Sequence, residues 1–161
     1  MLNHRSIEAV AAARRDAATV VPLYDTFGFA RLPELVRGVF TGSAPTAWAL
    51  GPLARRYEAV VFFLIDGFGW SLFERFADEL PFLRRALGDG FVSKLTAQFP
   101  STTAAHVTTL HTGLPVAESG VLEWFYYEPR LDAIFAPLLH ATVGPESLLP
   151  LPEGAAEALY P

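Results

Sequence analysis

The spacing of hydrophobic and polar positions changes several times along this chain, and each change predicts a different element. Residues 59–65 are seven consecutive apolar residues, rich in Val, Ile and Phe. A short, continuous apolar run favours a strand that is buried on both faces, as in a parallel sheet. From Trp70 to Ala77 apolar residues recur at helical spacing, with charged residues on the opposite side. We therefore predict a strand that leads into a helix.

A second strand follows, with a helix on each side of it. Residues 81–87 have the pattern of a short helix, residues 91–99 alternate between apolar and polar side chains, and residues 102–110 are helical again. Pro100 breaks the strand, and Gly113 ends the last helix. This order is typical of a right-handed βαβα unit. We predict an α/β fold with a mostly parallel, doubly wound sheet and helices on both of its faces.

The residues before this unit carry less information. Residues 6–16 and 32–40 have helical patterns, and a segment punctuated by Pro and Gly joins them. We interpret residues 1–45 as a lead-in of helices and loops, and residues 57–140 as the βαβα core.

Composition limits the classes of protein to which the chain can belong. Its 161 residues suffice for one domain, and none of them is a cysteine, which excludes disulfides and thiolate metal sites. A formal charge of −5 argues against a nucleic-acid-binding surface. Hydrophobic residues make up 52% of the chain and charged residues only 18%. This balance predicts a large core, or apolar surface that further chain would cover.

The sequence shows neither a secretory signal nor a membrane span. The longest apolar run, residues 59–65, is far shorter than a membrane span. The first sixteen residues place charged side chains around an alanine-rich centre and contain no secretory signal. We therefore expect a cytoplasmic protein without a membrane segment, whose oligomeric state the sequence leaves open.

Asp66 is the first candidate for chemistry. It follows the apolar run and precedes Gly67, so its carboxylate is expected at the carboxyl edge of the sheet, where open α/β sheets bind ligands. A carboxylate is a suitable ligand for a divalent metal ion. The alternative is that Asp66 caps the helix that follows it.

Three hydroxyl residues, 101–103, form the second candidate. Thr102 and Thr103 fall at the start of a predicted helix, where backbone N–H groups favour an anion. Coordination to a divalent cation would lower the pKa of a threonine hydroxyl enough to make it a nucleophile. The alternative is that these residues only cap the helix. His106 lies three residues after Thr103, on the same helical face, and would either donate to a bound oxyanion or pack.

At these residues the chain resembles the type I phosphodiesterase/nucleotide pyrophosphatase family, a branch of the alkaline phosphatase superfamily. The resemblance extends from Val60 to about Ala136. Four features carry it, in this order: the apolar run into Asp66-Gly67, Phe99-Pro100-Ser101-Thr102-Thr103, Thr112-Gly113-Leu114-Pro115, and Glu118-Ser119-Gly120-Val121.

The resemblance implies an alkaline-phosphatase-like fold and two divalent metal ions, usually Zn²⁺, with Mn²⁺ also compatible. It implies hydrolysis of phosphate diesters or nucleotide pyrophosphates through a covalent phosphothreonine, with a nucleotide or another small phosphorylated compound as substrate. The position nine residues before the threonine of Thr-Gly-Leu makes Thr103 the nucleophile, with Thr102 as the alternate. Asp66 would share a metal ion with Thr103, and His106 would contact the substrate phosphate.

Further metal ligands of such enzymes have no counterpart in this chain, since His140 and Asp132 are its only histidine and aspartate after Val121. We interpret the chain as the N-terminal part of one catalytic domain, inactive by itself. Two alternatives remain. One is a related hydrolase of phosphomonoesters, phosphonates or sulfate esters, and the other is a non-catalytic α/β binding domain.

Overall fold

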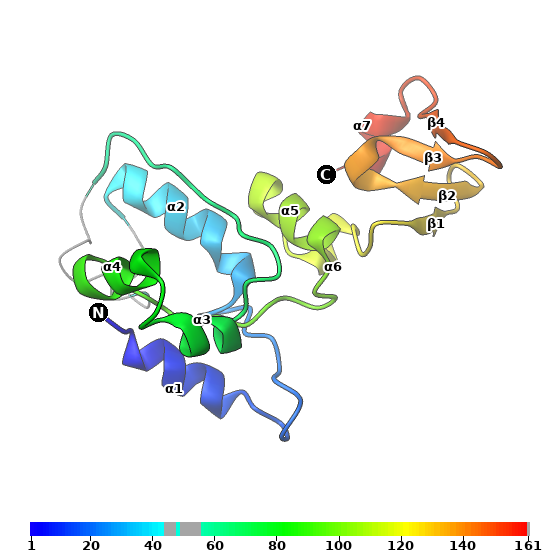
Figure 1. Cartoon of the computed structure of the whole chain (residues 1–161). Helices are drawn as coiled ribbons and strands as arrows, with labels where there is room; N and C mark the ends of the chain where they lie inside the picture. Colours follow the sequence, from blue (N-terminus) through cyan, green and yellow to red (C-terminus); the bar gives the residue numbers. More distant parts are fainter. Residues whose placement is uncertain (44–47, 49–55, 161) are drawn as a thin grey trace. The chain divides into compact units, whose positions relative to one another are not determined.

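The computed structural model of the chain describes residues 1–43, 48 and 56–160 (Figure 1). It divides into two compact units, Met1–Ala97 and Gln98–Pro161, each of which is described by itself. Residues 44 and 45, at the end of the predicted lead-in, lie outside the described residues.

Helices dominate the first unit, and the predicted helices are found there with shifted ends. They are α1 (His4–Ala12), the short 3-10 helix η1 (Phe29–Arg31), α2 (Leu32–Thr41), α3 (Trp70–Phe76) and α4 (Pro81–Asp89). α1 ends earlier than the predicted residue 16 because the Asp16 side chain accepts hydrogen bonds from Ala18 N at 2.9 Å and Thr19 N at 2.8 Å. These bonds close a turn that competes with a helix.

A buried asparagine joins distant parts of the first unit. Asn3 is 3% exposed, and its side-chain nitrogen donates to Trp48 O at 3.2 Å and to Ser93 Oγ at 3.0 Å. Its side-chain oxygen accepts from Ser6 N, which caps α1. Phe27 packs edge to face on Trp48, with ring centroids 5.6 Å apart. The Asn3 side chain therefore links the start of α1 to Trp48 and Ser93 through three hydrogen bonds in the small core of this unit.

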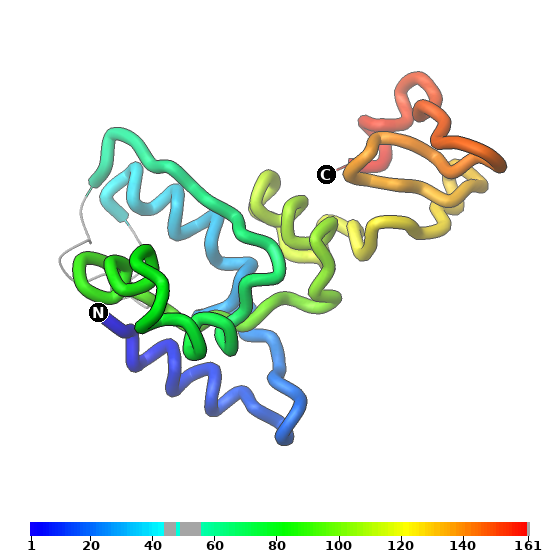
Figure 2. Tube along the Cα trace, in the orientation of Figure 1, coloured from blue at the N-terminus to red at the C-terminus, as the bar shows by residue number. Residues whose placement is uncertain are grey.

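The two strands predicted in this region are not strands in the described residues, and this part of the prediction is wrong. Residues 59–65 follow an irregular course (Figure 2) and leave Val61 76% and Phe63 80% exposed. Residues 91–99 form only two isolated bridges, Leu2 with Val92 and Gly28 with Thr96, both parallel. A strand is held by hydrogen bonds to a neighbouring strand, and no strand of the described chain pairs with residues 59–65.

The second unit contains two helices, then a small sheet, then a last helix. The elements are α5 (Thr103–Thr112), α6 (Val116–Ser119), β1 (Tyr126–Glu128), β2 (Ala133–Ala136), the 3-10 helix η4 (Pro137–Leu139), β3 (Ala141–Val143), β4 (Leu148–Pro150) and α7 (Ala155–Leu159). Neighbouring strands pair antiparallel in the order β1-β2-β3-β4. The predicted mixture of helices and strands is thus confirmed, but the sheet of the described residues is antiparallel.

Phe135, on β2, is the centre of this unit's core. It is fully buried, and its ring lies edge to face with Tyr126 at 5.6 Å and with Tyr160 at 5.7 Å. Short connections allow antiparallel strands to form between neighbours in sequence, whereas parallel strands need a long crossover. The sheet therefore forms where the chain can supply its own partners.

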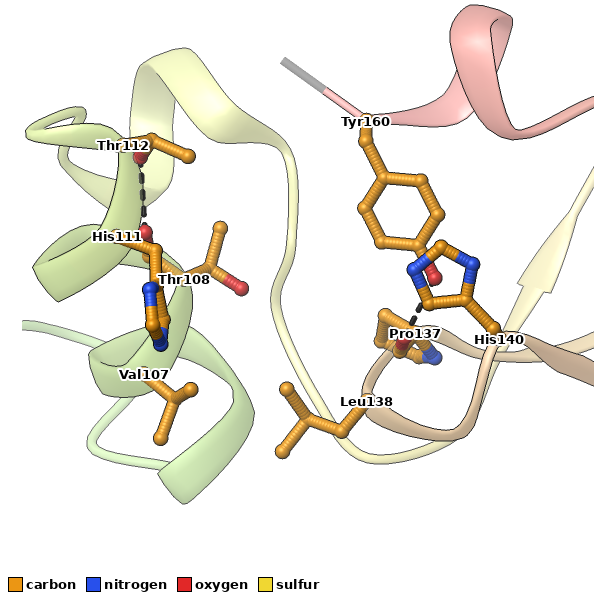
Figure 3. Close-up of a pocket in the computed structure, with 8 residues that line it drawn as sticks. All are labelled: Val107, Thr108, His111, Thr112, Pro137, Leu138, His140 and Tyr160. Atoms are coloured by element: carbon orange, nitrogen blue, oxygen red, sulfur yellow. Dashed lines mark hydrogen bonds between the residues drawn. The ribbon is translucent and has the colours of Figure 1, made fainter.

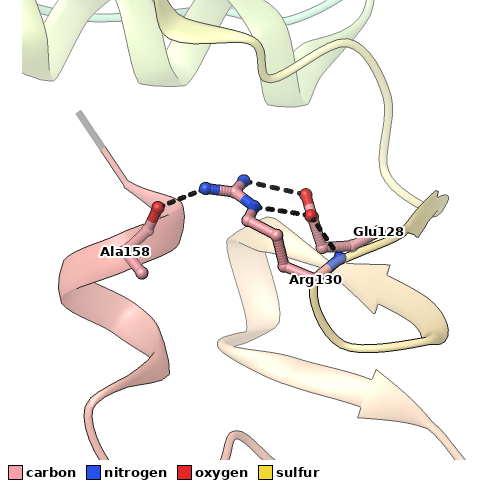
Figure 4. Close-up of polar contacts among 3 residues, drawn as sticks. All are labelled: Glu128, Arg130 and Ala158. Atoms are coloured by element: carbon pink, nitrogen blue, oxygen red, sulfur yellow. Dashed lines mark hydrogen bonds and ion pairs between the residues drawn. The ribbon is translucent and has the colours of Figure 1, made fainter.

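An ion pair attaches the last helix to the sheet (Figure 4). Arg130 donates from Nε to Glu128 Oε1 at 2.6 Å and from Nη2 to Oε2 at 2.9 Å, and its Nη1 donates to the carbonyl oxygen of Ala158 in α7. The hydrogen bonds from Arg130 to Glu128 lower the pKa of Glu128, whose side chain is buried in β1.

Among the described helices, none combines the length and hydrophobicity of a membrane-crossing segment.

Candidate active site

Asp66 lies in the turn that leads to α3. Its Oδ1 accepts a hydrogen bond from Gly67 N at 2.9 Å, and Gly67 adopts the left-handed conformation with φ of 71°. α3 begins after Gly69 and has no side-chain cap, so Asp66 is not the cap of this helix. The exposed carboxylate of Asp66 keeps the chemistry of a metal ligand.

The two threonines at the start of α5 have different positions. Thr102 is the N-cap: its hydroxyl oxygen accepts from Ala105 N at 3.3 Å, and its O–H donates to Leu122 O at 2.8 Å. Thr103 is the first residue of the helix proper and is half-buried. The capping alternative is correct for Thr102, because its hydroxyl is used in holding the helix start. Thr103 keeps its position at the start of the helix, where an anion is favoured, and its role as nucleophile stays a prediction.

Gln98 positions this helix start, and sequence reasoning missed it. The residue is 2% exposed, and its Nε2 donates to Ala105 O at 3.1 Å and to Thr109 Oγ1 at 2.8 Å. Its Oε1 accepts from Val116 N at 3.2 Å, at the beginning of α6. One amide side chain thus fixes the segment before α5 against two helices. Its polar character within the predicted strand was the available signal.

His106 faces back toward the helix start. Its Nδ1 donates to Thr102 O at 2.8 Å, so Nδ1 carries the proton in the neutral ring, and Nε2 accepts from Gln98 N at 3.4 Å. A nitrogen that presents a lone pair cannot donate to a phosphate oxygen. In this arrangement His106 therefore supports the turn that carries Thr103, and its contact with substrate phosphate stays a prediction.

The electrostatics at the start of α5 suit an anion. The helix has ten residues, no acidic side chain lies in its first turn, and Ala104 and Ala105 behind it are fully buried. Its first backbone N–H groups have no intrahelical partners, and the helix dipole adds a partial positive charge there. A phosphoryl group would be favoured at this end of the helix.

The described residues do not by themselves fit a pair of metal ions. Asp66 belongs to the first unit and Thr103 to the second. No group of three or more His, Asp or Glu side chains among the described residues is placed to hold a metal ion. Carboxylate and hydroxyl oxygens suit Zn²⁺ or Mn²⁺, but a zinc site normally has four ligands. The donor set is therefore incomplete in this part of the chain.

Comparison with known proteins adds one finding. The family model described as type I phosphodiesterase/nucleotide pyrophosphatase matches residues 60–142, just over half of the chain. The match includes Asp66, Thr102, Thr103 and His106. No curated protein and no solved structure matches the chain.

Proposed function

The chain belongs to the type I phosphodiesterase/nucleotide pyrophosphatase family, and on this premise we propose that it hydrolyses phosphate diesters or nucleotide pyrophosphates through a covalent phosphothreonine at Thr103. The observation that carries the assignment is the position of Thr103 at the start of α5, inside the segment that the family model matches. Thr102 uses its hydroxyl to cap α5, whereas Thr103 occupies the first helical position, at the anion-favouring end of the helix.

In the proposed reaction the Thr103 oxygen attacks phosphorus. A bond forms between this oxygen and phosphorus, the bond to the leaving alcohol or phosphate breaks, and the hydroxyl proton departs to the leaving group or to solvent. Water then attacks the phosphothreonine, which releases the phosphoryl product and restores the hydroxyl. Backbone N–H groups at the start of α5 stabilise the charge on the phosphoryl oxygens, and Gln98 and His106 hold this turn in place.

Two divalent metal ions, Zn²⁺ or Mn²⁺, are part of the proposal, with Asp66 and Thr103 as ligands. Since the donor set of the described residues is incomplete, the chemistry above is derived from the chain's own groups alone. We also propose that the chain forms part of an alkaline-phosphatase-like domain with a mostly parallel, doubly wound sheet.

The primary test compares the two threonines in the protein made from its complete gene. Activity is measured on bis(p-nitrophenyl) phosphate and on p-nitrophenyl phosphate, with ZnCl₂ or MnCl₂ added. Thr103→Ala should lower kcat by about three orders of magnitude or more, because it removes the attacking atom. Thr102→Ala should keep activity within about tenfold, since it removes only a cap. Wild-type turnover by Thr103→Ala would refute the assignment.

The covalent intermediate is tested separately. Acid quenching during turnover should trap the substrate's phosphoryl group on the peptide that contains both threonines, and tandem mass spectrometry should place it on Thr103. Modification of Thr102 would transfer the nucleophile role to that residue. Preference for the diester over the monoester separates a phosphodiesterase from a phosphomonoesterase of the same superfamily.

A further inference from the structure

A pocket of about 360 Å³ lies in the second unit, against the C-terminal half of α5 (Figure 3). Its volume is within the range of small-molecule sites, which is about 300–1,000 Å³. Helix α5 contributes Val107, Thr108, His111 and Thr112 to one wall. The pocket begins one helical turn beyond Thr103: Val107, its nearest lining residue on α5, is four residues further along, which is about 6 Å along a helix axis.

The opposite wall is held in place by its own contacts. The Tyr160 hydroxyl donates to Pro137 O at 2.5 Å, and the ring stacks on His140 with centroids 4.4 Å apart and planes 15° apart. The Tyr160 ring also meets the buried Phe135 edge to face. Leu138, from η4, extends this wall toward Val107 (Figure 3). A ligand would therefore enter a site whose aromatic wall is already ordered, which reduces the entropy cost of binding.

The polar groups of the pocket are hydroxyls and imidazoles, which include both donors and acceptors. The Tyr160 proton is used on Pro137 O, so this hydroxyl presents lone pairs. The Thr112 proton is used on Thr108 O, and its oxygen also accepts from Leu114 N at 3.1 Å. The imidazoles of His111 and His140 make no hydrogen bond with any residue that the structure describes. Each neutral imidazole offers one lone pair and one N–H. Among these groups, a ligand's hydrogen-bond donor can therefore pair with the Tyr160 hydroxyl or with an imidazole lone pair, whereas an acceptor can pair only with an imidazole N–H.

The electrostatics of the pocket also favour a ligand without negative charge. Among the described residues that line the pocket, the titratable ones are His111, His140 and Tyr160, and none is an Asp, Glu, Lys or Arg. The C-terminal end of α5 lies on this side, and the carbonyl groups of a helix C-terminus carry a partial negative charge. An anionic ligand is disfavoured there, whereas a neutral or cationic donor is accepted.

We propose that this pocket binds a small aromatic molecule that carries a hydroxyl or amino donor and no negative charge. The aromatic body would contact Val107, Leu138 and the Tyr160 ring, and the donor would reach an imidazole or hydroxyl lone pair. The proposal does not depend on the role of Thr103, and it assigns this half of α5 a binding function separate from phosphoryl transfer.

The four histidines of the chain provide the readout, because only His111 and His140 line the pocket while His4 and His106 do not. Imidazole carbon–proton NMR resonances are followed during titration with benzylamine, benzyl alcohol and benzoate. Benzylamine and benzyl alcohol should shift the resonances of His111 and His140 with about millimolar affinity, as expected for fragments of this size. Benzoate should bind at least tenfold more weakly than either.

Two variants locate the site. His111→Ala changes an exposed helix position and should weaken benzylamine binding at least fivefold, as should Val107→Phe, which fills the pocket. His4→Ala, in the first unit, is the matched control and should leave binding unchanged. The remaining imidazole resonances confirm that each variant is folded. The proposal is overturned if no resonance shifts, if all four shift alike, if benzoate binds as tightly as benzylamine, or if both pocket variants bind normally.

Discussion

Two apolar segments of similar composition have opposite fates in this molecule. Residues 59–65, in the first unit, form no strand in the described chain, and Phe63 is 80% exposed. β2 in the second unit has the shorter sequence Ala-Ile-Phe-Ala, yet it pairs on both sides and buries Phe135 completely. The difference is the availability of partner strands, because β1 ends and β3 begins within a few residues of β2. Hydrophobic character makes a segment capable of forming a strand, and a neighbouring strand with free backbone groups determines whether it forms one.

The largest predicted effect tests this contrast directly. Phe135→Ala should destabilise the second unit by about 3–5 kcal/mol, because it removes a fully buried ring that contacts Tyr126 and Tyr160. Phe63→Ala, the matched change at an exposed ring, should change stability by about 0.5 kcal/mol or less. Urea unfolding followed by NMR resonances of each unit measures both. A large loss in Phe63→Ala would show that residues 59–65 are buried in solution.

The same contrast explains which parts of the fold the sequence could predict. Helices depend on local spacing and on caps, so α2, α4 and α5 were predicted to within a few residues. The antiparallel sheet was missed because its strands have only three or four residues, too few for a clear alternation. The predicted parallel strands depend on long-range pairing, which a local pattern does not contain.

The candidate site shows a similar limit. The sequence located the start of α5 and the hydroxyls beside it, since Ser and Thr after a proline are a strong helix-start signal. The family spacing favoured Thr103 as nucleophile, but the sequence could not show that Thr102 caps the helix, because its cap is joined to a hydrogen bond with Leu122, twenty residues away. Gln98 was missed for the same reason: its partners lie on α5 and α6.

A second prediction asks whether long-range hydrogen bonds hold the second unit together. Thr102→Ala removes the cap of α5 and the bond to Leu122, and should destabilise this unit by about 1–2 kcal/mol. Thr103→Ala is the neighbouring control and should have a smaller effect, since it is not the cap. Urea midpoints from α5 amide resonances report both. Equal losses would mean that the two hydroxyls share the capping role.

The third prediction compares ion pairs in the two units. Arg130→Gln should destabilise the second unit, because it leaves the buried Glu128 carboxylate without its main partner and α7 without its contact at Ala158. Arg85→Gln breaks the exposed pair with Asp89 in α4 and should have little effect. Thermal unfolding at neutral pH measures both. Equal effects would contradict the distinction between a buried and an exposed carboxylate.

The stability difference between wild type and Arg130→Gln should depend on pH. Its pH dependence follows from the pKa of Glu128, which Arg130 holds below its ordinary value of 4.5. The stabilisation is fully present above pH 4.5 and is lost as the pH falls through the lowered pKa of the folded protein. The gap between wild type and Arg130→Gln should therefore narrow on acidification below pH 4.5. A gap that stays constant down to pH 2 would show that the ion pair is not its source.

The smallest expected effect occurs at high pH, where the pKa of Tyr160 reports whether its ring is packed in the second unit. Burial, with a smaller contribution from Tyr126, raises the pKa of Tyr160 from 10.0 to about 12. The folded state therefore keeps the protonated phenol, and the resulting stability is fully present below pH 10 and is lost as the pH rises toward 12. Tyr160→Phe should flatten the fall in unfolding free energy over this interval, with the exposed Tyr24→Phe of the first unit as the matched control. An unchanged slope in Tyr160→Phe would mean that the Tyr160 ring is not packed against Phe135 and His140 in solution, and the aromatic wall of the pocket would then be absent.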